Sequence, residues 1–233
     1  MMRLDRFLAN SGAGTRNEVK KMIREGLVEV NGTRAKKGSE QVDENNDVIT
    51  LEGSVIRYSR YVYFMLNKPQ GCISATEGNM PTVMDLIAEP YNDMFPCGRL
   101  DKDTEGLLLI TNDGPLAHAL LSPSRHVEKE YYVRLRDPIG EDYVQKLAAG
   151  MKVDGDLQCQ PAVMKPIDAY TCTVILKEGK FHEIKRLFAA LGNEVVFLKR
   201  LRMKNLVLDE DLAPGEYRPL YEEEIEDLRE SQE

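Results

Sequence analysis

The stretch GRLDKDTEGLLLITNDG, residues 98–114, decides the fold, because a dense group of charges directly precedes a short apolar run. This apolar run predicts a buried strand over 107–111, and Asn112-Asp113-Gly114 predicts the turn that ends it. The charged residues therefore lie in a loop that leads into a rigid strand. Functional side chains concentrate in loops that a rigid scaffold holds in place.

Composition favours a folded protein with one large domain or two unequal ones. The 233 residues are 42% hydrophobic and 30% charged. No segment approaches the roughly 18 uninterrupted apolar residues of a membrane helix. The first residues lack the apolar stretch and cleavage site of a secretory signal, and the four widely spaced cysteines are typical of reduced thiols. We therefore expect a cytoplasmic protein without a membrane partner.

Charge is unevenly distributed along the chain, although the net charge is −8. Residues 1–37 carry nine Lys/Arg against four Asp/Glu, whereas residues 209–233 carry two Arg against eleven Asp/Glu. A basic front with an acidic tail is compatible with phosphate binding at one end. The negative net charge therefore does not exclude an RNA partner.

The first sixty residues have the pattern of a small domain of helices and a hairpin. Leu4, Phe7 and Leu8 are spaced for one face of a short helix. The segment 15–18, TRNE, has the form of a capping box and opens a second helix. An Asn-Gly pair at 31–32 predicts a hairpin turn, and residues 48–51 predict a further strand. Residues 52–60 lack a clear period and are interpreted as a linker, so the first domain is expected to span residues 1–59.

This N-terminal pattern resembles the ribosomal-protein-S-four-like RNA-binding domain. The resemblance rests on Thr15, Arg16 and Glu18 at the start of the second helix, and on the hairpin segment 26–32, GLVEVNG. It implies that basic side chains of this domain contact RNA phosphates, namely Arg3, Arg6, Arg16, Lys20, Lys21 and Arg34. The alternative is that these charges form only a solvated helix face.

From residue 61 onward the pattern becomes rich in strands. Strands are predicted over 61–66, 107–111, 130–136, 172–177 and 194–198. Helices are predicted over 83–87, 115–121, 141–149 and 184–191, with a short acidic helix over 222–228. Strands outnumber helices and do not alternate strictly with them. An α+β fold with a mixed or antiparallel sheet is therefore expected for a second domain, residues 60–233.

The opening stretch closely resembles the signature of the RNA pseudouridine synthases of the ribosomal small-subunit synthase A group. In that family the Asp of GRLD is catalytic, which implies this role for Asp101. Arg99, two residues earlier, would help to flip the base or hold a phosphate. Without the resemblance, an Asp in a charged loop is more often a turn cap, which is the role expected for Asp103 or Asp113.

The chemistry of that family sets the other requirements of the site. A carbon–nitrogen glycosidic bond breaks and uracil carbon 5 joins the same sugar carbon, so nothing is oxidised or added overall and no cofactor is required. An ionised carboxylate beside the ribose acts as nucleophile or base, and a nearby cation keeps it ionised. The target base must also leave its stack and rest against an aromatic side chain.

Two further motifs resemble those that meet these requirements. The segment 128–133, EKEYYV, resembles a K-x-Y motif and implies that Tyr131 packs against the target base, preceded by Lys129. A strand Tyr is otherwise more often ordinary packing. Alternation along a strand sends Tyr132 to the opposite face.

The third motif lies in the segment 178–188, EGKFHEIKRLF. Its cation pairs with the catalytic Asp in the family, which implies Lys185, with Arg186 as a close rival. Glu183 departs from the family pattern, because Gln is usual at this position. The alternative for the two cations is a solvated or phosphate-bound helix start.

The three motifs together imply a cofactor-independent synthase that isomerises one uridine of 16S ribosomal RNA, in free RNA or an assembling small subunit. Two alternatives stay open: a synthase acting on 23S ribosomal RNA, and an RNA-binding ribosome-assembly factor without catalysis. His182 has no second His near it and the cysteines do not cluster, so no metal site is expected. We expect a monomer, because the RNA supplies the large partner surface.

Overall fold

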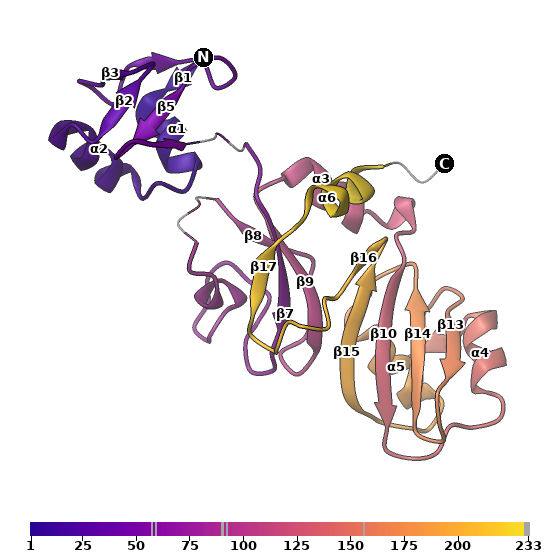
Figure 1. Cartoon of the computed structure of the whole chain (residues 1–233). Helices are drawn as coiled ribbons and strands as arrows, with labels where there is room; N and C mark the ends of the chain where they lie inside the picture. The colour runs from indigo at the N-terminus through magenta and orange to yellow at the C-terminus, as the bar shows by residue number, and fades with distance from the viewer. Residues whose placement is uncertain (57, 59, 90, 92, 156, 231–233) are drawn as a thin grey trace. The chain divides into compact units, whose positions relative to one another are not determined.

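The computed structural model describes residues 1–56, 58, 60–89, 91, 93–155 and 157–230 (Figure 1). The chain divides into two compact units, the first formed by Met1–Val62 with Ile87–Met94, and the second by Tyr63–Leu86 with Phe95–Glu233. The expected domain boundary at 59 and part of the expected linker 52–60 fall on residues 57 and 59, which lie outside the described residues.

The first unit combines two helices with a small sheet. Helix α1 spans Leu4–Asn10 and α2 spans Arg16–Glu25. The sheet has the strand order β3-β2-β5-β6, and β1 pairs with β4 beside it. These strands are β1 (Met2–Arg3), β2 (Val28–Val30), β3 (Thr33–Arg34), β4 (Gln41–Val42), β5 (Ile49–Leu51) and β6 (Ser54–Ile56). The linker interpretation was wrong for residues 54–56, because they form β6, which pairs antiparallel with β5.

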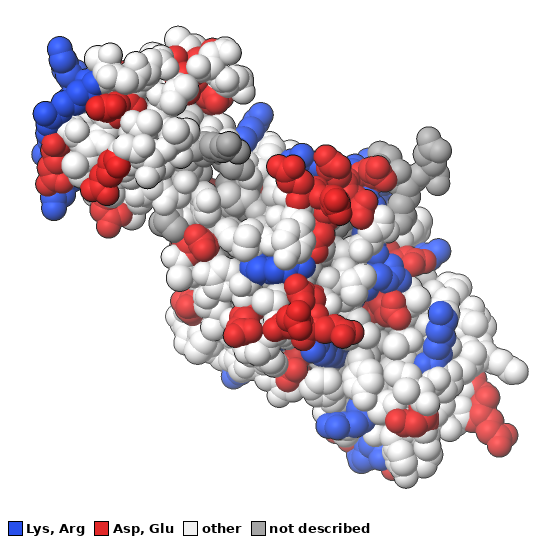
Figure 2. All heavy atoms as spheres, viewed as in Figure 1, with Lys and Arg blue, Asp and Glu red and all other residues white. Residues whose placement is uncertain are grey.

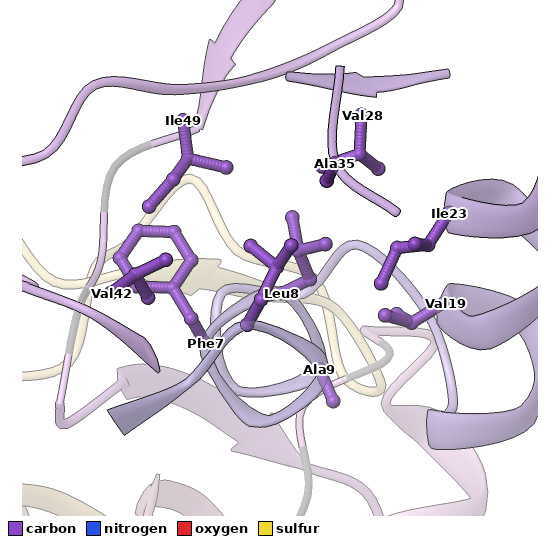
Figure 3. Packing of buried hydrophobic residues seen from close by; sticks show 10 residues of the cluster. Phe7, Leu8, Ala9, Val19, Ile23, Val28, Ala35, Val42 and Ile49 are labelled. Carbon is purple, nitrogen blue, oxygen red and sulfur yellow. The ribbon is translucent and has the colours of Figure 1, made fainter. Parts of the chain in front are cut away.

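The predicted capping box opens α2. The backbone N–H of Glu18 donates to the Thr15 hydroxyl, and the Thr15 N–H donates to the Glu18 carboxylate over 2.7 Å. Gly26 ends the helix with a left-handed backbone. Figure 3 shows Phe7 and Leu8 of α1 packed among residues of α2 and the sheet, which buries the apolar stripe predicted from the sequence.

The second unit is built on one nine-stranded sheet among the described residues, with the order β13-β14-β10-β15-β9-β7-β17; in addition, β16 pairs with β15 and β8 pairs with β9. Its strands are β7 (Tyr63–Lys68), β8 (Phe95–Cys97), β9 (Glu105–Thr111), β10 (Lys129–Leu135), β13 (Val163–Pro166), β14 (Thr171–Leu176), β15 (Val195–Met203), β16 (Leu206–Val207) and β17 (Tyr217–Pro219). A separate hairpin pairs β11 (Lys152–Val153) with β12 (Leu157–Gln158). β15 and β9 run parallel while the other pairs are antiparallel, so the expected mixed α+β sheet is confirmed.

Helices cover the sheet at its ends and one face. They are η1 (Val83–Leu86), α3 (Gly114–Leu121), η2 (Pro123–Arg125), α4 (Tyr143–Ala149), α5 (Glu183–Ala190) and α6 (Glu222–Arg229). The predicted helix over 83–87 is a single 3₁₀ turn. Asp113 caps α3, as expected, because its carboxylate accepts from the N–H of Leu116 over 3.1 Å. α4 packs beside β13 and α5 beside β15 (Figure 1).

Charge is segregated within each unit. Figure 2 shows Lys and Arg gathered over α2 of the first unit, and Asp and Glu gathered over α6 of the second. Among the described helices, none has the length and apolar character needed to cross a membrane.

Candidate active site

Asp101 lies in the loop between β8 and β9, at the mouth of a cleft in the second unit. The backbone N–H of Thr104 donates to the Asp101 carbonyl over 3.1 Å and closes a tight turn just before β9. The apolar run 107–110 after this turn is fully buried in the sheet, whereas the charged residues 101–103 are at least partly exposed. The Asp101 carboxylate is three-quarters buried and turned toward α5.

Lys185 of α5 joins the two acidic residues of this loop. Its Nζ lies 3.1 Å from Oδ2 of Asp101 and 2.6 Å from Oδ1 of Asp103. Burial alone would lower the pKa of Lys185, but the hydrogen bonds to Asp103 and Asp101 outweigh it and raise the pKa above its usual value. Asp103 is thus an ion-pair partner rather than the turn cap expected from the sequence. The ammonium group stays charged at neutral pH and balances the carboxylate.

His182 touches the same carboxylate from its other side. Its Nε2 lies 3.4 Å from Oδ1 of Asp101, and the residue occupies the N-cap position of α5 with a left-handed backbone, φ 51°. A non-glycine residue in this conformation carries strain that the surrounding structure must support. The turn before α5 therefore aims an imidazole at Asp101.

Tyr131 lines the same cleft as Asp101. The walls of the cleft also include Arg99, Leu176 and Leu198. In β10, Tyr131 lies directly across from Arg200 of β15, and most of its ring is buried. A carboxylate and a tyrosine ring from two separate sequence motifs therefore line one cleft, and the cation of the third motif, Lys185, contacts the carboxylate.

Tyr132 has a different environment from its neighbour. Its ring makes an edge contact with Phe197, with centroids 6.1 Å apart, and it does not line the cleft. This is the alternation expected along a strand.

Lys68 at the end of β7 is a structural member of the site that the sequence reasoning missed. Its side chain is 0% exposed, and its Nζ donates to the carbonyl oxygens of Pro69, Asp101 and Thr104 over 2.9–3.0 Å. Burial lowers the pKa of this ammonium. The signal in the sequence is only an Asn-Lys pair directly after the predicted strand 61–66.

Glu183, the departure from the usual Gln, is buried in the wall of the cleft. Its Oε2 accepts from the N–H of Lys180 over 2.8 Å. The other carboxyl oxygen, Oε1, is buried and has no hydrogen-bond partner. Burial and the adjacent Glu178 raise the pKa of Glu183 to about 8, so the acid is largely protonated at neutral pH. A proton on Oε1 supplies the missing donor toward Glu178, as the amide of Gln would.

Glu178 and Glu183 also lie near a buried thiol. One oxygen of each and the Cys159 sulfur lie within 4.8 Å of one another, the sole such group of metal-ligand types among the described residues. Both oxygens of Glu178 are already engaged, by the N–H of Gln160 at 2.8 Å and by Lys180 Nζ at 2.6 Å. The Lys180 ammonium thus supplies the positive charge that a metal ion would otherwise bring to this group.

The three remaining residues of the second unit that were predicted to contact RNA lie in different environments. Arg99 is exposed and lines the cleft. Arg186 does not reach Asp101 in this structure, since its guanidinium pairs with Asp154. Lys129 is buried, donates to the Val127 carbonyl over 2.9 Å, and lies outside the cleft lining. A buried, hydrogen-bonded ammonium is not available to an RNA phosphate.

A second, basic groove lies on the first unit. Its lining includes Arg3 and Lys20 together with three cations that the sequence analysis had not assigned to RNA, Arg24, Lys36 and Lys37. The other basic residues predicted to contact phosphate, namely Arg6, Arg16, Lys21 and Arg34, are exposed but do not line this groove. Arg34 donates to the Glu25 carbonyl over 2.9 Å and thereby ties the hairpin to α2.

The second unit thus carries a carboxylate–lysine pair at a cleft, and the first unit carries a basic groove. Comparison with known proteins identifies the class. The family model described as RNA pseudouridylate synthase matches residues 62–190, and the model of the S4 domain matches residues 2–49. The chain therefore belongs to the RNA pseudouridylate synthase family, and it is an isomerase that carries an RNA-binding domain at its N-terminal end.

Full-length relatives agree with this assignment. The chain is 47% identical over 99% of its length to the "Uncharacterized RNA pseudouridine synthase YtzG" of Bacillus subtilis, and covers 100% of that protein. It is 41% and 39% identical to proteins named "Ribosomal small subunit pseudouridine synthase A" from Haemophilus influenzae and Escherichia coli, with 97% and 96% of the chain matched and 99% and 98% of those proteins covered. A crystal structure of a pseudouridylate synthase matches with a TM-score of 0.70 at 41% identity, covering 98% of this chain and 100% of that one.

Proposed function

We propose that this synthase converts one uridine of 16S ribosomal RNA to pseudouridine, in free RNA or in an assembling small subunit. The support comes from the relatives, because two of them, 39–41% identical over nearly the whole chain, are named for the ribosomal small subunit. The enzyme would work as a monomer, without a cofactor, in the cytoplasm where ribosomal subunits assemble.

The observation that carries the proposed mechanism is the contact of 3.1 Å between Lys185 and Asp101, whose side chain lines the cleft. Asp101 is the proposed catalytic carboxylate. It attacks or activates the ribose of the flipped nucleotide while Lys185 balances its charge. Tyr131 packs against the base, because its ring lines the same cleft as Asp101.

The reaction needs no group beyond these side chains. The bond from the ribose carbon to the uracil nitrogen breaks, and a new bond forms from the same ribose carbon to uracil carbon 5. Carbon 5 then loses its hydrogen, and the freed ring nitrogen gains one. Atoms and electrons balance without an oxidant, a reductant or added water.

Basic residues of both units would hold the RNA. Arg99 lies at the cleft and is the proposed phosphate contact nearest to the reacting nucleotide. In the first unit, the groove with Arg3, Lys20 and Arg24 is the proposed main phosphate contact. Arg6, Arg16, Lys21 and Arg34 would extend it, and Lys129 is left out because it is buried.

Tritium release from carbon-5-labelled uridine tests the proposal. The label leaves only when carbon 5 forms the new bond, so the wild-type protein is expected to release about one tritium per 16S RNA molecule, and Asp101→Asn none. Release from 23S RNA alone would overturn the 16S target. Full release by Asp101→Asn would overturn the role of the carboxylate.

A further inference from the structure

Phe181 is the most exposed aromatic side chain among the described residues, at 69% of its surface. Single exposed apolar side chains are common on proteins and carry no meaning by themselves. This one is distinguished by its position, because its sequence neighbours Lys180 and His182 both line the cleft that holds Asp101.

The Phe181 ring is already half of a stack. It lies over the His182 imidazole with ring centroids 3.7 Å apart and planes inclined by 22°. His182 in turn lies 3.4 Å from Asp101. One face of Phe181 is therefore covered by a ring that touches the reacting carboxylate, while its outer face is exposed to solvent.

The backbone that carries this stack is held firmly. The Lys180 N–H donates to the Glu183 carboxyl over 2.8 Å, and Arg186 donates from its guanidinium to the Phe181 carbonyl over 3.2 Å. The N–H of Arg186 also donates to the carbonyl of His182, which has a left-handed backbone. An exposed apolar ring on a braced, strained turn is preorganised, so little ordering entropy is lost when a partner covers it.

The chemistry around the ring fits a nucleic acid. Lys180, next to Phe181 in the chain, and the exposed Arg99 both line the same cleft. Flat apolar faces flanked by cations are the arrangement that stacks bases and holds the adjoining phosphates. A protein partner would instead be expected to need a wider apolar patch.

We propose that the outer face of Phe181 stacks on a base next to the target uridine, and so holds the strand open while the uridine occupies the cleft. This inference rests on the proposed RNA substrate. In this arrangement the neighbouring base, Phe181 and His182 form a continuous stack that ends at Asp101. Phe181 is a positioning residue, because it touches the substrate strand but not the reacting atoms.

The chain contains no tryptophan, which allows a direct test. Phe181→Trp gives the protein a single tryptophan, whose fluorescence is quenched when a base stacks on it. Tyr221→Trp is the matched control, since Tyr221 is 64% exposed but does not line the cleft. Adding 16S RNA is expected to quench Phe181→Trp at least about twofold and to change Tyr221→Trp little.

A second variant gives a kinetic readout. Phe181→Leu keeps an apolar side chain but loses the flat ring, and is expected to raise KM about 10-fold to 100-fold with kcat changed less than threefold. Phe181→Tyr is expected to retain the wild-type KM. Equal melting temperatures would show that folding is intact.

The outcomes separate this inference from the proposed function. Tritium release from 16S RNA without quenching, and with an unchanged KM for Phe181→Leu, would overturn the stacking role and leave the synthase assignment standing. Quenching by 16S RNA without tritium release from it would support stacking and overturn the proposed target.

Discussion

The ammonium of Lys68 lies 3.0 Å from the backbone carbonyl oxygen of Asp101, so the proposed catalytic loop is tied to the first strand of the sheet by a fully buried side chain. The same nitrogen donates to the carbonyls of Pro69 and Thr104. Three carbonyl groups from two separate segments thus converge on one cation. The loop is braced because one fully buried donor satisfies three backbone acceptors.

Lys68→Met is expected to lower the free energy of unfolding by about 3 kcal/mol, because three backbone carbonyls lose the donor that a fully buried ammonium supplies. The loop that carries Asp101 also loses its support, so kcat is expected to fall more than KM rises. Urea unfolding and steady-state kinetics measure the two effects. Lys177→Met, on an exposed lysine, is the control and is expected to change neither quantity. Wild-type stability in Lys68→Met would refute the bracing role.

The sequence allowed most of the fold to be predicted, but less of the environment of each side chain. The apolar run 107–111 and the TRNE capping box are local signals, and local geometry follows from them directly. Burial of Lys68 is decided by strands that are distant in the sequence, so no local pattern reveals it. The same holds for the basic run 199–204, whose composition alone is compatible with an RNA-lined cleft or a solvated strand edge. In fact β15 lies between β10 and β9, and Arg200 is 2% exposed.

Lys185 and Asp103 are expected to contribute differently to catalysis, although both touch the same network. Lys185→Met removes the positive charge beside Asp101, which is expected to lower kcat by about 100-fold or more. Asp103→Asn leaves the contact between Lys185 and Asp101 in place, and is expected to lower kcat by less than about 10-fold. Single-turnover tritium release measures both. A larger loss of kcat in Asp103→Asn than in Lys185→Met would mean that Asp103, and not Asp101, carries the chemistry.

Glu183 is expected to make stability depend on pH. Its pKa in the folded protein is raised to about 8, above the value of 4.5 for an unperturbed glutamate, so the folded state binds more protons than the unfolded state between these values. Stability therefore falls as pH rises through this window, by at most about 1.4 kcal/mol per pH unit. The pKa of Glu178 is lowered, so that group titrates below the window.

Glu183→Gln is expected to remove this dependence, because the amide donates permanently toward Glu178 and still accepts from the Lys180 N–H. The variant should be at least as stable as the wild type at pH 8, with a smaller decline in the urea midpoint between pH 6 and pH 8. Glu222→Gln, on an exposed glutamate, should keep the wild-type decline. An identical pH profile for Glu183→Gln and the wild type would show that the acid is ionised in the folded protein.

Gly106 marks the point where the catalytic loop enters the sheet, and a side chain there is expected to be strongly destabilising. A Cβ at Gly106 would lie 2.2 Å from the Arg200 carbonyl oxygen, on backbone with φ 102°. Both atoms belong to paired strands, β9 and β15, so neither yields easily. Gly106→Ala is expected to cost about 3 kcal/mol or more of unfolding free energy. Gly114→Ala meets nothing within 4 Å at the start of α3, and is expected to be neutral or slightly stabilising. Equal melting temperatures for the two variants would mean that the strands separate enough at Gly106 to admit a methyl group.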